Sequence, residues 1–111
     1  MTIDKLTIAV PVYNEAEYIR QTVESCIGEA RRIVLYDNAS TDGTSDICAA
    51  LAAEYDTVFH VRHTENIGAH DNMRFALDAC ETEYFALMVS HDLLEKNYST
   101  PLLAEIGRAH V

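Results

Sequence analysis

The feature that most constrains the fold is the regular alternation of β-rich runs with amphipathic segments. Four runs rich in Val, Ile, Leu, Phe and Tyr span residues 6–12, 32–36, 57–62 and 83–89. The segments between them carry apolar residues at helical spacing, as the first does at Ile19, Val23, Cys26 and Ile27. Because strands that alternate with helices are joined by right-handed crossovers, the sequence predicts an α/β fold. A mostly parallel sheet of about four strands should carry helices on both faces.

The predicted helices also have recognisable apolar faces and start signals. The second should bury Ile47, Cys48, Leu51, Ala52 and Tyr55, and the third Met73, Ala76, Leu77 and Cys80. Asn14 is expected to cap the first helix, and Ser40, Thr41, Asp42 and Thr44 are all competent to cap the second.

Composition limits the kind of protein that this chain can be. The 111 residues suit one small domain, and a net charge of −10 disfavours contact with nucleic acid or an anionic membrane. The sequence holds no apolar run of 18 residues and no basic-then-apolar leader, so no membrane span is expected in this segment. A cytoplasmic location is the default expectation.

The three cysteines are not expected to carry chemistry. Cys26, Cys48 and Cys80 are widely spaced, without the patterns of a disulfide framework or a zinc site. Each falls on the apolar side of a predicted helix, so all three should be small buried thiols.

Polar residues gather where each predicted strand ends. The first strand ends in PVYNE and the second in YDNASTDGT, the third is followed by TENIGAHDN, and the fourth ends in SHD. In an open parallel sheet, ligands bind in the crevice beyond the carboxyl ends of the strands. The sequence therefore predicts a ligand site at this edge.

Asp37 stands out because a bare carboxylate directly follows a run that should be buried. Desolvating a carboxylate is costly unless a partner compensates it. The partner could be a turn of the chain itself, or a ligand group such as the N3 imide of uracil. His60 and His63 lie three residues apart on an extended segment, so they should point to opposite faces and form no obvious site.

Four blocks together resemble the N-terminal half of a family 2 glycosyltransferase with the Rossmann-like GT-A fold. The blocks are TIAVPVYNEAEYIRQTVESC, IVLYDNASTDGTSDI, ENIGAHDNMRFALDA and EYFALMVSHDLL, and the resemblance covers about residues 6–99. It implies transfer of a sugar from a nucleotide-sugar donor, with Mg²⁺ or Mn²⁺, to a carbohydrate or lipid-linked acceptor. Polysaccharide or glycoconjugate synthesis is the setting that such a family member would serve.

The resemblance also implies roles for particular residues. The strand-one block that lines the nucleotide pocket corresponds here to Pro11, Val12, Tyr13 and Glu15. Asp37 corresponds to the aspartate that contacts the base. Asn66 and Gly68 match the loop before the third helix, where glycine lets the backbone pass close to the donor or to neighbouring strands.

The SHD sequence stands where the family carries its metal-binding acidic motif, and two alignments remain open. If the following LLEKNY anchors the alignment, Asp92 is the metal ligand. If SHD anchors it, Asp92 is the earlier acidic position and Leu93 has replaced the later one, which would weaken binding of Mg²⁺. We favour Asp92 as the ligand and count His91 among the donor-site residues.

The end of the chain has an unusual sequence. Residues 106–111 read IGRAHV, which a widely used short-read sequencing adapter would encode. We expect residues 1–105 to be a truncated nucleotide-sugar-binding segment and residues 106–111 to be adapter read-through. The catalytic base would then lie beyond the truncation, and this fragment alone should be inactive. The full-length protein could still associate with a membrane.

Two other functions compete with the transferase. A non-catalytic nucleotide-binding or interaction module could keep the same fold with a degraded metal motif, which Leu93 after Asp92 would favour. A dinucleotide-dependent oxidoreductase or a sugar nucleotidyltransferase is disfavoured, because no GxGxxG follows the first strand and no Gly-Lys-Ser/Thr phosphate loop occurs.

Overall fold

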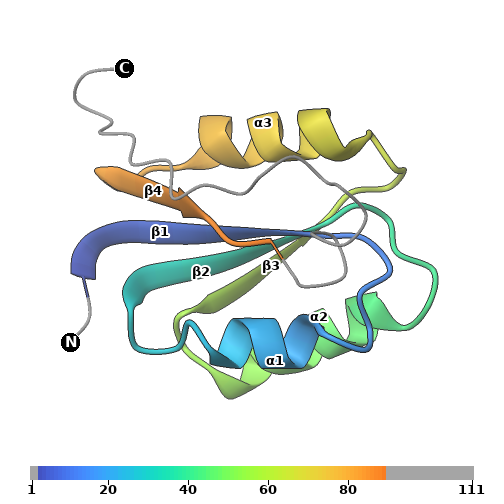
Figure 1. Cartoon of the computed structure of the whole chain (residues 1–111), viewed down its shortest axis with the longest axis horizontal. Helices are drawn as coiled ribbons and strands as arrows, with labels where there is room; N and C mark the ends of the chain where they lie inside the picture. Colours follow the sequence, from blue (N-terminus) through green and yellow to red (C-terminus); the bar gives the residue numbers. More distant parts are fainter. Residues whose placement is uncertain (1–2, 90–111) are drawn as a thin grey trace.

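The computed structural model describes residues 3–89 of the chain (Figure 1). Seven elements alternate along it: β1 (Ile3–Val12), α1 (Ile19–Glu24), β2 (Ala30–Asp37), α2 (Thr44–Glu54), β3 (Val58–Arg62), α3 (Ala69–Ala79) and β4 (Tyr84–Leu87). Within this part of the chain, no helix is long and apolar enough to cross a bilayer.

The four strands form one sheet in the order β3-β2-β1-β4, with every neighbouring pair parallel. This confirms the predicted parallel α/β architecture. The chain steps outward from β1 to β2 and β3, then returns to place β4 on the other side of β1. The order therefore reverses between β1 and β4, which is the kind of switch point where ligands bind in open α/β sheets.

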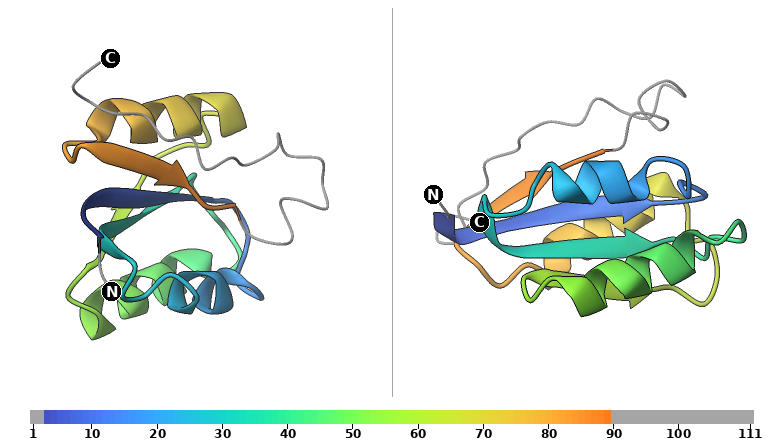
Figure 2. Two further views of the ribbon diagram at one scale, coloured as in Figure 1. Left: turned by 60° about the vertical axis from the view of Figure 1, so that its left-hand side comes forward. Right: turned by 90° about the horizontal axis from the view of Figure 1, so that it is seen from below.

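Helices cover both faces of the sheet, as predicted. The two-helix face carries α1 and α2, whereas α3 lies on the opposite face, which we call the α3 face (Figure 2). Right-handed crossovers explain the division. The connections that hold α1 and α2 step in one direction along the sheet, and the connection that holds α3 steps back past β2 and β1.

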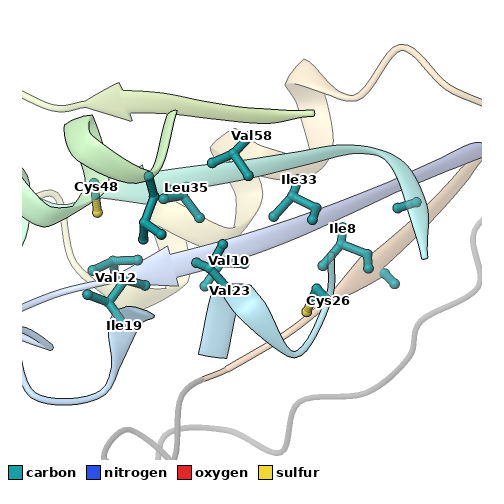
Figure 3. Close-up of a cluster of buried hydrophobic side chains, with 13 residues drawn as sticks. Ile8, Val10, Val12, Ile19, Val23, Cys26, Ile33, Leu35, Cys48 and Val58 are labelled. Carbon is teal, nitrogen blue, oxygen red and sulfur yellow. The ribbon is translucent and has the colours of Figure 1, made fainter. Parts of the chain in front are cut away.

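Alternate residues of each strand supply two separate cores. On the two-helix face, Ile8, Val10 and Val12 of β1 join Ile33 and Leu35 of β2 beneath the apolar sides of both helices (Figure 3). The residues between them point the other way, where Ala9, Val34 and Tyr36 pack against Ala76 and Cys80. This period-two alternation is what a sheet buried on both faces requires.

The cysteines are buried in these cores, as predicted. Cys26 and Cys48 lie on the two-helix face, Cys80 lies on the α3 face, and all three are free thiols. Burial, reinforced by the negative charges of Asp37 and Asp42, raises the pKa of Cys48 to about 12. Cys48 is therefore protonated and unreactive at neutral pH.

The start of α1 differs from the prediction. Asn14 does not cap this helix, which begins at Ile19 with Tyr18 at the N-cap position. Asn14 instead adopts a left-handed conformation with φ 52°, and its side-chain oxygen accepts a hydrogen bond from the Thr41 N–H at 2.8 Å. The prediction was wrong because a partner 27 residues away takes the side chain that would otherwise cap the helix.

Leu35 tests the two-helix core. It is fully buried in the inner strand β2, so Leu35→Ala should leave a cavity and lower the free energy of unfolding by about 3 kcal/mol. Urea unfolding followed by circular dichroism would measure the change. Leu77→Ala, at a half-buried position of α3, should cost less, and equal losses would contradict this account of the core.

Candidate functional site

Three strand ends meet at the same edge of the sheet. Val12 at the end of β1 pairs with Asp37 at the end of β2, and Asp37 pairs with Arg62 at the end of β3. This register brings together the connections that follow β1, β2 and β3, residues 13–18, 38–43 and 63–68 (Figure 1). We call them the β1 loop, the β2 loop and the β3 loop.

Side-chain hydrogen bonds join the β1 loop to the β2 loop. The Asn14 N–H donates to Ser40 Oγ at 2.9 Å, and the Asn14 side chain accepts from the Thr41 N–H. The Glu15 N–H donates to Thr44 Oγ1 at 2.9 Å. The prediction that Ser40, Thr41, Asp42 or Thr44 caps α2 was wrong, because Gly43 is at its N-cap position without a side-chain cap hydrogen bond. Ser40 and Thr44 instead link the loops.

Asn38 joins the β2 loop to the β3 loop. Its side-chain oxygen accepts the Ile67 N–H at 2.9 Å, and its Nδ2 donates to the Gly68 carbonyl at 3.2 Å. Asn38 is buried although it lies in a loop. The sequence analysis missed this role, and the one available signal was its place directly after Asp37 at the end of a buried strand.

Asp37 finds its partners within the protein. The side chain is fully buried, its Oδ1 accepts the Ser40 N–H at 3.1 Å, and its Oδ2 accepts the Ser45 hydroxyl. Arg62 Nε lies 3.8 Å and His60 Nε2 lies 3.7 Å from the same Oδ2. The fold itself thus compensates this carboxylate, and the predicted contact with a base stays a prediction.

His60 and His63 point to opposite faces of the sheet, as predicted. Each nevertheless lies beside a buried polar residue, Asp37 or Asn72. His60 lies beside Asp37 on the two-helix face. On the α3 face, His63 Nε2 lies 2.8 Å from Asn72 Oδ1, and Asn72 Nδ2 donates to the Tyr36 carbonyl at 3.0 Å. The polar position of Asn72 within the apolar face of α3 was the signal that the sequence analysis did not use.

Asp42 is exposed but well supplied with hydrogen-bond donors. Its Oδ1 accepts both the N–H and the hydroxyl of Thr44, and its Oδ2 accepts the Ala16 N–H at 3.3 Å. Slight burial works to raise the pKa of Asp42, but these hydrogen bonds outweigh it and leave the pKa below its usual value. The ionised form of Asp42 therefore supports the start of α2.

Two loop residues that are not glycine have positive φ angles, Asn14 at 52° and Ala39 at 64°. Asn tolerates the left-handed region, but Ala does not favour it. Gly68 has φ 88°, a conformation that glycine readily adopts, and a Cβ there would meet no described atom within 4 Å. Backbone strain of this kind tends to gather at functional sites.

The residues predicted for the nucleotide pocket divide by exposure. Pro11, Val12 and Glu15 are buried at the end of β1 and the start of the β1 loop, as Asp37 is at the end of β2. Tyr13, Asn66 and Gly68 are exposed. His91 and Asp92 lie outside the described residues, and so does Leu93.

A metal site is not evident in the described part of the chain. Residues 3–89 contain no group of three or more His, Cys, Asp or Glu side chains able to hold an ion.

A hollow of about 410 Å³ lies between α1 and the end of β4, lined by Tyr18, Gln21, Thr22, Ser25, Met88 and Val89. Its lining contains none of the predicted site residues.

The parallel sheet, its switch point and the three joined loops define an open α/β protein of the doubly wound type. Residues 7–111 match the family described as glycosyl transferase family 2. The chain belongs to this family, and the four-stranded sheet with its helices is part of a GT-A fold.

Three similar proteins place the chain within this family. It is 28% identical over 106 residues to glycosyltransferase GlyA of Streptococcus pneumoniae, covering 93% of this chain and 15% of that protein. It is 30% identical over 95 residues to the putative teichuronic acid biosynthesis glycosyltransferase TuaG of Bacillus subtilis, covering 83% of this chain and 38% of that protein.

The third is a solved structure, the mannosyltransferase PcManGT from Pyrobaculum calidifontis in complex with GDP-Man and Mn²⁺. It is 27% identical, with a TM-score of 0.69, covering 77% of this chain and 27% of that chain. The chain thus spans between 15% and 38% of the lengths of these three proteins.

Replacing the strained Ala39 should stabilise the fold. Ala39→Gly should relieve the left-handed conformation and raise the free energy of unfolding by roughly 0.5–1 kcal/mol, after allowing for the greater freedom of unfolded glycine. Chemical denaturation would measure it. The matched variant Ala50→Gly, at an exposed helical position of α2, should instead lose about 1 kcal/mol. A loss in both variants would show that Ala39 is not strained.

Asp42 should contribute to the acid sensitivity of the fold. Because its pKa is lowered in the folded protein, its contribution is present above the unfolded value of about 4 and is lost as pH falls through the folded value. Asp42→Asn should therefore destabilise the protein at pH 7 and have much less effect near pH 2. Unfolding free energies measured across this range would test it, and a pH-independent difference would contradict it.

Proposed function

We propose that this chain is the donor-binding segment of a glycosyltransferase that uses a nucleotide sugar and a divalent metal. The whole enzyme would transfer the sugar to a carbohydrate or lipid-linked acceptor during polysaccharide or glycoconjugate synthesis. The observation that carries the proposal is the meeting of the β1, β2 and β3 loops at the carboxyl edge of the sheet in a family 2 chain.

The nature of the donor is suggested by the similar proteins. PcManGT was solved with GDP-Man and Mn²⁺, and TuaG is described as a teichuronic acid biosynthesis enzyme. The first description fits a nucleoside diphosphate sugar as donor, and the second fits a role in polysaccharide synthesis. The base and the sugar of the donor for this chain are left open by the proposal.

The proposed donor-site residues have different roles, according to whether they are exposed or buried. Tyr13, Asn66 and Gly68 are exposed on the β1 and β3 loops and could touch the nucleotide directly. Pro11, Val12 and Glu15 are buried and would shape the floor of the pocket. Asp37 belongs to the same proposed site, although its buried carboxylate could touch a base only if the β2 loop moved.

Asp92, with His91 beside it, remains our proposed holder of the metal. Such an ion would neutralise the negative charge that develops on the departing diphosphate. The protein's own contribution in this segment would be to orient the nucleotide, because positioned reactants lose less freedom on reaching the transition state. The catalytic base is assigned to a later part of the whole enzyme, so turnover by this chain alone is not expected.

The alternative is a non-catalytic module that keeps the fold and has a degraded metal motif. The observation in its favour is Leu93, which directly follows Asp92 where a second acidic residue would strengthen a metal site. The two functions differ in whether nucleotide binding depends on a divalent ion.

Calorimetry can separate these functions. The chain should bind at least one of UDP, GDP and CDP in the presence of Mn²⁺, and binding should weaken at least about tenfold without the ion, because the ion screens the diphosphate charge. Asp92→Ala should remove the dependence on Mn²⁺. The control Asp78→Ala, at an exposed position of α3, should bind like the wild type.

Binding that is equally strong with and without Mn²⁺ would favour the module. An absence of binding to all three nucleotides would count against the donor-binding proposal.

A further inference from the structure

Asp37 and His60 lie side by side on the two-helix face, where the carboxylate is fully buried and 16% of the histidine side chain is exposed. The Asp37 side chain has no exposed surface, and both of its oxygens already accept hydrogen bonds. His60 Nε2 is also buried, and it has no hydrogen-bond partner among residues 3–89. The two groups lie 3.7 Å apart, too far for a hydrogen bond and close enough for one to form with a small movement.

We infer that Asp37 anchors the β2 loop from inside without touching the donor, and that His60 is the positioning residue that completes this anchor. This inference rests on the proposed function, because the loop that Asp37 holds belongs to the proposed donor site. It replaces the direct base contact that the family resemblance implied for Asp37 with an indirect role.

The geometry of Asp37 argues against direct contact. To reach a ligand, its carboxylate would have to leave both the Ser40 N–H and the Ser45 hydroxyl. Arg62 reinforces this arrangement, because its Nε donates to Ser45 Oγ at 2.9 Å and its Nη2 donates to the Ser40 carbonyl at 3.3 Å. Breaking the set would strip a buried carboxylate of its partners, which is strongly unfavourable.

Ser40 connects Asp37 to the β1 loop through hydrogen bonds. Its N–H binds Asp37, its carbonyl binds Arg62, and its Oγ accepts the Asn14 N–H from the β1 loop. On the other side, the Asp37 carbonyl accepts the His63 N–H at the start of the β3 loop at 2.9 Å. Displacement of Asp37 would therefore disturb all three loops.

His60 Nε2 is placed to become a further partner of Asp37, because it lies 3.7 Å from Oδ2 and has no hydrogen-bond partner among residues 3–89. A buried donor or acceptor without a hydrogen bond is unfavourable, so a small movement that gives His60 Nε2 a partner would be favourable. Asp37 from β2 faces His60, and Arg62 from β3 lies beside the same carboxylate. The Ser45 hydroxyl from α2 lies between Asp37 and Arg62. Closing the gap to about 2.8 Å would give a charge-assisted hydrogen bond to Asp37.

A pair of His60 variants tests the positioning role. His60→Leu removes the hydrogen-bond donor and fills the space with an apolar side chain. His60→Gln can present an amide N–H in place of Nε2. In His60→Leu we expect the Ser40 and Thr41 amides to exchange with solvent about tenfold faster, with an equal or higher melting temperature. His60→Gln should restore exchange to within about twofold of the wild type.

This combination separates positioning from bulk stability, because a merely structural histidine would change amide exchange and melting temperature together. His70→Leu, at an exposed position of α3, is the matched control and should leave both amides unchanged. Wild-type exchange at Ser40 in His60→Leu would overturn the role of His60.

Asp37→Asn tests the indirect role of the anchor. At a temperature where the variant stays folded by circular dichroism, its affinity for each of UDP, GDP and CDP that the wild type binds with Mn²⁺ should fall by the same factor. A selective loss for UDP would mean that Asp37 touches the base and would overturn the inference. If wild-type protein bound no nucleotide, the proposed function would fail, while the amide-exchange measurements would still decide the anchor.

Discussion

The compensation of one buried carboxylate underlies the arrangement of the whole strand-end region. Asp37 ends the inner strand β2 without any exposed surface, so its charge must be met from within the protein. The partners come from the β2 loop, from α2 and from β3, through Ser40, Ser45 and Arg62. Because the Asp37 carboxylate needs these partners, it holds the β2 loop, α2 and β3 close together at the end of β2.

Much of the fold could be predicted from local patterns. Apolar periodicity located the strands and helices, and strand–helix alternation indicated the parallel sheet, because both patterns are set by neighbouring residues. The polar contacts could not be found in this way. Asn14 binds a residue 27 positions away, Asn38 one 29 positions away and Asn72 one 36 positions away, and these distances are bridged only once the sheet has formed.

The same limit explains the mixed outcome for the candidate site. The polar residues that follow β1, β2 and β3 gather at one edge as expected, since carboxyl ends of parallel strands share an edge. The SHD sequence, residues 90–92, lies outside the described residues. The division of labour among the gathered residues depends on burial, which local sequence does not give. Tyr13 and Asn66 proved exposed, whereas Asp37 and Asn38 lie inside and hold loops. The role proposed for His60 depends on the register between β2 and β3, which places Arg62 opposite Asp37.

Two of the side chains that link the loops, Asn38 and Ser40, are buried, and this has a consequence for protein engineering. Residues that set the shape of the edge, such as Asn38 and Ser40, are distinct from residues that face solvent, such as Tyr13. Libraries intended to alter ligand preference should therefore randomise the outward-facing positions and keep the inner ones constant. Variants made in that way would differ in the side chains that can contact a ligand, while the hydrogen bonds that hold the loops stay the same.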